Sequence, residues 1–417
     1  MEKKNRSTLL LMALTILIDF TGFGLIIPLL PFWAEHLGAS VVGITMVSAA
    51  YALAQFIFTP LFGALSDRYG RKSVIFGSLL IEVVSLVLSA VAGTFPILLL
   101  ARFIGGLGAS NIGSAQAVIA DITTPEKRAH GMGMIGAAIG LGFVIGPALS
   151  GALSPLGTTL PFWIAAVVAL INALLVLILL PETRTRQASG NTYPQRGFTT
   201  FFTGWRSAKS HRAILNLILV NLLFTIAFTG MENIFPLFGQ HYFSWGAPQI
   251  GYIFTYVGVV IVIMQGGLVR TLVKSFTERR VMVGGLIVLA AGLVLLAFSQ
   301  NLWLVLLTLA LISIGEGAVT PTISTLLSFA SSQEALGETL GLAQGVGGLG
   351  RILGPLLAGV IYQALKPGSP FIAGGILVVL AVIAVLPVLS AIHRPASTIE
   401  TQEAVVAETS GSAGKRH

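Results

Sequence analysis

The feature that most constrains the fold of this chain is an internal repeat with an offset of 208 residues. The glycines and the proline between Gly133 and Gly151 recur with the same spacing between Gly341 and Gly359. The same offset relates Phe20-Thr21-Gly22 to Phe228-Thr229-Gly230, Pro28-Leu29 to Pro236-Leu237, and Gly43 to Gly251. Because three matches share one spacing, the sequence predicts two copies of one structural half.

The composition indicates that both halves lie in a lipid bilayer. Charged residues make up 10% of the chain and apolar residues 55%, whereas a soluble domain has roughly 25% charged residues. A helix needs about 20 residues to cross a bilayer, and hydrocarbon tolerates only structures that satisfy their own backbone groups. We therefore predict twelve helical spans, near residues 7–34, 41–66, 73–92, 95–121, 130–154, 160–181, 212–238, 248–273, 281–299, 301–330, 337–364 and 370–392.

The positive charges predict the orientation of the chain. Of the 24 Lys and Arg residues, all but Arg102, Arg351 and Lys366 fall in the tails or in the even-numbered loops. By the positive-inside rule, both termini and the long central loop are expected in the cytoplasm, and the protein in the inner membrane of the cell. The net charge of +8 then reflects topology, so we predict no nucleic-acid partner.

Four segments follow from these spans. We predict a six-helix bundle over 1–181, a cytoplasmic central loop over 182–211, a second six-helix bundle over 212–394 and a disordered polar tail over 395–417. The chain has no Cys, which excludes disulfides and thiolate metal sites. No pair of His residues has ligand spacing, so no metal site is predicted.

The loop after the second span carries a recognisable motif. It reads Gly63-Ala-Leu-Ser-Asp67-Arg68-Tyr-Gly70-Arg71-Lys72 and resembles the cytoplasmic signature of the major facilitator superfamily. The resemblance implies an all-α membrane fold of twelve helices in two pseudo-symmetric six-helix bundles. It also implies that Asp67, Arg68, Arg71 and Asp121 form a charge network at the cytoplasmic gate that holds the outward-open state. The alternative is that these charges only set the topology.

The glycine series of the fifth span is similar to the motif that marks antiporters within that superfamily, with Ser150 in place of one glycine. Small residues on one face let helices pack backbone to backbone, and a proline permits a bend. The resemblance implies a hinge, and the alternative is a packing role without gating. Its residues are Gly133, Gly142, Gly146, Pro147 and Gly151.

Motifs in two further spans resemble the twelve-span drug:proton antiporter branch, which includes tetracycline and multidrug exporters. The first span carries Asp19-x2-Gly22-x-Gly24-x3-Pro28-x2-Pro31, and the fourth carries Arg102-x2-Gly105-Gly106-x-Gly108-Ala109. Gly105 stands where that branch often has Gln. The resemblance covers spans 1, 2, 4 and 5, and the internal repeat extends the fold prediction to the rest.

Six charged residues fall inside predicted spans, where each costs about 2.5 to 3.5 kcal/mol and is a functional candidate. In the superfamily's architecture, spans 1, 4, 7 and 10 line the cavity and spans 3, 6, 9 and 12 face lipid. Burial raises the pKa of a carboxyl group, whereas a nearby cation lowers it. An Asp19–Arg102 pair is therefore expected to exchange protons. The candidates for proton coupling and substrate binding are Asp19, Arg102, Glu232 and Glu316, with Glu82 and Arg351 in second rank.

These patterns predict a secondary transporter and not an enzyme. The chain has no Walker-type phosphate loop, so we expect protons as the coupling ion and no cofactor. The expected function is proton-coupled export of a small amphipathic or lipophilic solute by a monomer working by alternating access. One alternative is a symporter or facilitator for uptake of a small nutrient, and another is a sensor or scaffold that transports nothing.

Overall fold

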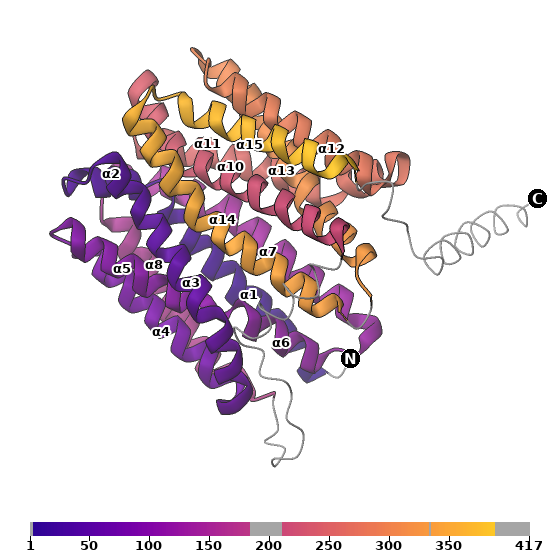
Figure 1. Ribbon diagram of the computed structural model, residues 1–417. Coiled ribbons are helices and arrows are strands. Elements are labelled where there is room, and N and C mark those ends of the chain that lie inside the picture. Colours follow the sequence, from indigo (N-terminus) through magenta and orange to yellow (C-terminus); the bar gives the residue numbers. More distant parts are fainter. Residues whose placement is uncertain (1–2, 184–210, 333–334, 388–417) are drawn as a thin grey trace, which may run out of the picture.

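The computed structural model describes residues 3–183, 211–332 and 335–387, and in these ranges every regular element is a helix (Figure 1). The first half contains α1 (Lys3–Ile26), α2 (Leu30–His36), α3 (Val41–Tyr69), α4 (Arg71–Ala90), α5 (Phe95–Gly108), η1 (Ala109–Asn111), α6 (Ile112–Ile122), α7 (Pro125–Leu153), η2 (Ser154–Leu156) and α8 (Leu160–Leu179). The second contains α10 (Arg212–Phe243), α11 (Ala247–Ile263), η3 (Met264–Leu268), α12 (Val269–Leu296), α13 (Leu302–Ala330), α14 (Leu336–Ala364) and α15 (Ser369–Val385).

The described helices supply the twelve predicted spans. Ten are long and apolar enough to cross a membrane, and the longest of them covers 50 residues from Ala247 to Leu296. That helix contains two spans, because Thr277 has a φ of 72° and breaks it. Splitting it and adding the 17-residue α15 gives twelve spans. The end of the last predicted span, beyond residue 387, lies outside the described residues.

Two of the spans are interrupted within their length. The first stops being helical between α1 and α2, where Pro28 cannot donate a backbone hydrogen bond. The eighth contains the π-turn η3, which links α11 to the start of α12. The fourth span continues through α5, the short 3₁₀ turn η1 and α6. The predicted spans are therefore present, with local breaks that hydropathy alone does not place.

The two halves repeat the same packing. Helix α1 packs on α7 in the first half as α10 packs on α14 in the second, and α4 packs on α8 as α12 packs on α15. The pairs α4–α5 and α12–α13 correspond in the same way. The structure thus confirms the prediction of two pseudo-symmetric six-helix bundles, called here the N bundle and the C bundle. The central loop 182–211 and the tail 395–417 fall almost entirely outside the described residues, so the segment limits stay a prediction.

A glycine seam joins α7 to α1, and an equivalent seam joins α14 to α10. A Cβ atom at Gly142 or Gly146 would meet the backbone of α1 near Thr21. At the repeat-related positions, Gly350 and Gly354, it would meet Thr225 and Thr229 of α10. These contacts explain the recurrence of the motif, because only hydrogen at the α-carbon permits such close helix packing.

The bundles contact each other at one end of the molecule and midway along the helices, where Gly258 lies against the backbone of Phe143 and Gly348 against the ring of Phe56. At the end that carries α2, hereafter the α2 end, Gln240 donates a hydrogen bond to Glu35 (2.8 Å), and Gly151 lies against the backbone of α11 at Pro248. At the opposite end, hereafter the terminal end, glycines of the same inter-bundle helices face open space: Gly63, Gly133, Gly136, Gly266, Gly267 and Gly341. The cleft between the bundles therefore opens at the terminal end.

Candidate functional site

The turn between α3 and α4 holds three of the four predicted gate charges together. Arg71 forms ion pairs with Asp67 (2.8 Å) and with Asp121 at the end of α6 (3.4 Å). Thr183, just after α8, donates a hydrogen bond to Asp121 (3.3 Å). Arg68 instead lies over the ring of Tyr69. All of these contacts are inside the N bundle, at the terminal end, where the cleft is open.

Glu182 completes this turn, although sequence reasoning did not single it out. Its carboxylate accepts hydrogen bonds from the backbone N–H groups of Arg71 (2.9 Å) and Lys72 (3.3 Å), the first two residues of α4. A carboxylate at a helix N-terminus satisfies unpaired donors and opposes the helix dipole. Gly70 has a φ of +98°, and a Cβ atom there would collide with the carboxylate of Glu182. The glycine of the motif is thus required both for its backbone conformation and for the close approach of Glu182.

The carboxylate of Asp19 lies in the interior of the N bundle. Asn172 of α8 donates a hydrogen bond to one oxygen (3.0 Å), and Asn111 at the end of η1 donates to the other (3.4 Å). Glu82 of α4 interacts with it electrostatically. Among the described residues no ion pair joins Asp19 to Arg102, so the expected pair is replaced by two amides and a second acid.

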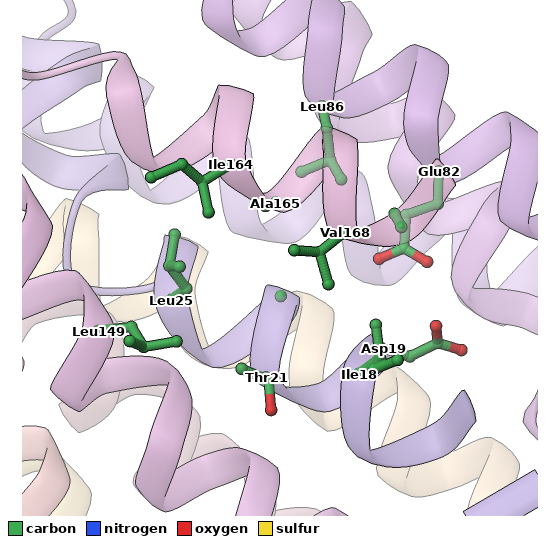
Figure 2. A pocket seen from close by; sticks show the side chains of 12 residues that line it. Ile18, Asp19, Thr21, Leu25, Glu82, Leu86, Leu149, Ile164, Ala165 and Val168 are labelled. Carbon is green, nitrogen blue, oxygen red and sulfur yellow. The ribbon is translucent and has the colours of Figure 1, made fainter. Parts of the chain in front are cut away.

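Arg102 is buried, with 4% of its surface exposed, and its guanidinium lies 4.6 Å from the centre of the Tyr51 ring. This cation–π contact compensates part of the cost of burying the charge. Glu82 supplies a further electrostatic interaction. Glu82 lies on the third span, which the superfamily's architecture places toward lipid, but its side chain lines the same cavity between helices as Asp19 (Figure 2).

Aromatic rings extend from Tyr51 along the inner face of the N bundle. Phe23 of α1 lies 5.3 Å from Tyr51 and 6.0 Å from Phe143 of α7, measured between ring centres. Phe20 contacts Phe143 as well, at 5.5 Å. Such offset and edge-on pairs are favourable, and they give this face a flat apolar character.

The C bundle holds its two acids on a different kind of surface. Glu316 of α13 accepts a hydrogen bond from Thr320 (3.0 Å), and its second oxygen is buried without a partner. Glu232 of α10 is half-buried and interacts electrostatically with Glu316. Thr320 and Ser324 continue an exposed polar stripe from Glu316 along α13. The opposite face of α13 packs on α12, so this stripe points away from α12.

Arg351 lies between the two bundles. It follows Gly350 on α14, the helix that packs against α3 of the N bundle, and it is exposed in the open cleft. An electrostatic interaction connects it with Tyr51 of α3. Tyr51 thus stands between two arginines, one from each bundle. A tyrosine ring between two guanidinium groups offers binding to charged or aromatic groups. The described residues contain no cluster of His, Asp and Glu suited to a metal.

Sequence reasoning missed Asn111 and Asn172, which hold Asp19. The available signal was weak but present, because Asn172 is a single amide in a very apolar helix and is completely buried. Buried polar side chains in membrane helices bond to one another across helices. A search for isolated amides in otherwise apolar spans would have selected this residue.

Two helical bundles related by an internal repeat, with a cleft between them and charges inside the membrane, define a transporter of the two-bundle class. A model of the Major Facilitator Superfamily matches residues 12–275 and 243–414 of the chain. The chain belongs to this superfamily, and it is a multi-pass membrane transporter, not an enzyme.

Similar proteins support this assignment over nearly the whole length. The tetracycline resistance protein, class C, of Escherichia coli is 30% identical over 366 residues, which is 87% of this chain and 91% of that protein. Multidrug resistance protein 1 of Bacillus subtilis (strain 168) is 29% identical over 399 residues, 95% of this chain and 100% of that protein. The crystal structure of the human organic anion transporter MFSD10 (TETRAN) is 25% identical, with a TM-score of 0.70, over 91% of this chain and 99% of that chain.

Proposed function

We propose that this protein exports a small amphipathic or lipophilic drug in exchange for protons. The observation that carries the proposal is the pair of acids, Glu232 and Glu316, on the cleft surface of the C bundle. The names of the similar proteins, which refer to tetracycline and multidrug resistance, support the direction and the class of solute. The glycine seam of α7, which resembles the antiporter motif, supports exchange over uptake.

The orientation proposed for the protein places the terminal end in the cytoplasm, since the described Lys and Arg residues of the loops gather there and Lys366 alone lies at the α2 end. In this state the cleft opens to the cytoplasm and admits a solute from that side. We further propose a monomer with cytoplasmic termini, divided into bundles 1–181 and 212–394.

The acid pair supplies a reason for exchange. Two neighbouring carboxylates in a low-dielectric site do not both stay ionised at low cost, so the pair is stabilised either by a proton or by a cationic part of the solute. When the pair is protonated, the transporter changes conformation without bound solute. When the pair is deprotonated, it binds the solute. Each proton that moves down 100 mV contributes about 2.3 kcal/mol, which sustains a solute gradient of roughly tens-fold.

Purified protein in proteoliposomes tests this function. With the cytoplasmic side outward, added substrate should release protons, and an imposed proton gradient should drive substrate uptake into the vesicles. A drug-susceptibility and dye-efflux panel in a host that lacks its own exporters identifies the solute. Substrate accumulation together with protons in right-side-out vesicles would instead establish the uptake alternative.

A further inference from the structure

A partly open cavity lies between helices of the N bundle, apart from the cleft. It has a volume of about 60 Å³ and is lined by α1, α4, α7 and α8 (Figure 2), and two of its lining residues, Leu149 and Val168, are each 39% exposed. A water molecule needs roughly 10–15 Å³ in the same measure, so several waters fit by volume. Their polar partners are Asp19, Glu82 and Thr21, since the other lining residues are apolar. Drug-sized ligands occupy pockets of roughly 300–1,000 Å³ and do not fit. The size of the cavity therefore suits water and protons but excludes the solute.

The cavity runs from the buried acids toward the α2 end. Asp19 and Glu82 lie at one end of it, and Leu25, Leu149 and Ile164 lie at the other (Figure 2). The three apolar residues are within a few positions of where α1 and α7 end and α8 begins, at the α2 end of the bundle. At that same end the cleft is closed by contacts between the bundles, such as the hydrogen bond from Gln240 to Glu35. The cavity thus leads to this side by a route other than the cleft.

Polar atoms without partners border the acids. The side chain of Asn172 is completely buried, and its Oδ1 atom has no hydrogen-bond partner although its Nδ2 atom donates to Asp19. The hydroxyl of Thr15, 1% exposed and one helical turn before Asp19, also lacks a partner. An unpaired buried polar atom is costly, which indicates that these atoms bond to something in another state of the site.

Rotation of one amide explains how Asn172 serves two states. While Asp19 is ionised, the Nδ2 group of Asn172 donates to it. Once Asp19 is protonated, its O–H becomes a donor, and a half-turn of the amide presents Oδ1 as the acceptor. The proton passes from a cavity water to the carboxylate and returns by the same route, so no other reactant is needed.

The charged groups around Asp19 are not balanced, because two acids lie near a single arginine. Asp19 interacts with Glu82 from α4 and with Tyr51 from α3, and Glu82 interacts in turn with Arg102 from α5. The cavity-lining residues of α7 and α8 are apolar. With both acids ionised and Arg102 charged, the group carries a net charge of −1, which a single bound proton neutralises.

We propose that this cavity is a proton path of the transporter, that Asp19 and Glu82 receive a proton from water that enters at the α2 end, and that Asn172 is a positioning residue for both protonation states. This path through the N bundle is separate from the cleft, where the solute meets the Glu232–Glu316 pair. This inference rests on the proposed proton-coupled export.

Filling the cavity tests the route. Val168 lines the cavity and is 39% exposed, whereas its neighbour Val167 does not line it and is 56% exposed. Val168→Trp should slow substrate-driven proton release in proteoliposomes about tenfold, because the indole ring fills the space that water would occupy; a tenfold lower rate corresponds to a barrier raised by about 1.4 kcal/mol. Equilibrium binding of the drug should stay unchanged, and Val167→Trp should behave like the parent protein. Equal proton-release rates in the two variants would overturn the proposal.

Single-cysteine labelling tests whether water enters the cavity. The chain has no native Cys, so only the introduced cysteine reacts. Cysteine at Ile164 or Val168 should react with a charged, membrane-impermeant thiol reagent added at the α2 side. Cysteine at Val167 should react only with a membrane-soluble reagent. If all three positions react only with the membrane-soluble reagent, an acyl chain fills the cavity and the proposal is wrong.

Substitution of Asn172 separates this inference from the proposed function. Asn172→Leu should shift the pH profile of export and lower the number of protons moved per drug, with drug binding retained, and Asn172→Gln should restore part of the coupling. If Asn172→Leu couples normally while Glu232→Gln abolishes export, the proton path is wrong and the antiporter stands. If the parent protein moves drug without protons, the proposed function itself fails.

Discussion

The two bundles share one scaffold but place their polar groups differently. The acids Asp19 and Glu82 correspond by the repeat to Ala227 and Ala290, and both alanines are buried. When Pro161-Phe162 is aligned with Pro370-Phe371, whose Phe side chains are both fully buried, Asn172 corresponds to the buried Ala381. The C bundle therefore packs with an apolar interior where the N bundle is polar.

On the cleft side, the C bundle carries the acids and the N bundle carries glycines at the corresponding positions. Glu232 corresponds by the repeat to Gly24, which packs against the proline of α7, and Glu316 corresponds to Gly108, which packs against α4. The scaffold thus folds without an acid at any of these positions. Since intramembrane charge is costly, its retention in two distinct places indicates two distinct tasks, one within a bundle and one at the cleft.

The strongest test of this comparison removes one acid from each site. Asp19→Asn and Glu232→Gln should each abolish proton-coupled export while the protein still inserts, with the drug gradient falling by roughly tens-fold for the loss of one coupled proton. Drug accumulation in energised inverted vesicles measures the effect. The amount of each variant in the membrane fraction controls for insertion. Full export by both variants would show that neither site couples protons.

The shared scaffold is tested through the glycine seams. Gly146→Ala should lower stability by about 1–3 kcal/mol, because the added methyl group meets the carbonyl oxygen of Thr21. Gly354→Ala should do the same against α10, whereas Gly133→Ala and Gly341→Ala, which face open space, should be tolerated. Thermal unfolding in detergent measures all four variants. A large loss at only one of the two seams would break the equivalence of the bundles.

A smaller effect is expected from the hydrogen bond that orients Glu316. Thr320→Val removes a donor at 3.0 Å and leaves the shape of the side chain almost unchanged. The loss of about 1 kcal/mol should weaken substrate binding several-fold. Isothermal titration with the identified drug measures it, and Thr325→Val, whose hydroxyl bonds only to the backbone of Pro321, is the control. Identical affinities would show that Thr320 does not act through Glu316.

The smallest effect concerns the gate charges, where the bundles also differ. The repeat places Ser275 opposite Asp67, so only the N bundle has this acid. The side chain of Asp67 is 42% exposed, and an exposed ion pair contributes at most about 1 kcal/mol. Asp67→Asn should slow transport a few-fold and leave drug binding intact. Equal losses in transport rate and in binding would contradict a role in conformational cycling.

The sequence alone was enough to predict the membrane, the twelve spans and the duplicated packing. Each of these depends on patterns that the chain carries locally, since span length follows from bilayer thickness and the glycine spacing follows from helix geometry. Thus Gly146 and Gly354 were matched before any contact was known, and both lie in equivalent seams.

Only the tertiary structure decided which partners the buried charges have. The sequence suggested that Asp19 pairs with Arg102 and placed Glu82 on a peripheral span, but Asp19 bonds to Asn111 and Asn172, and Glu82 shares its cavity. The physical reason is that in a uniformly apolar helix the hydropathy pattern does not fix rotation about the helix axis. Packing against neighbouring helices sets that rotation, and with it the direction in which each acid points.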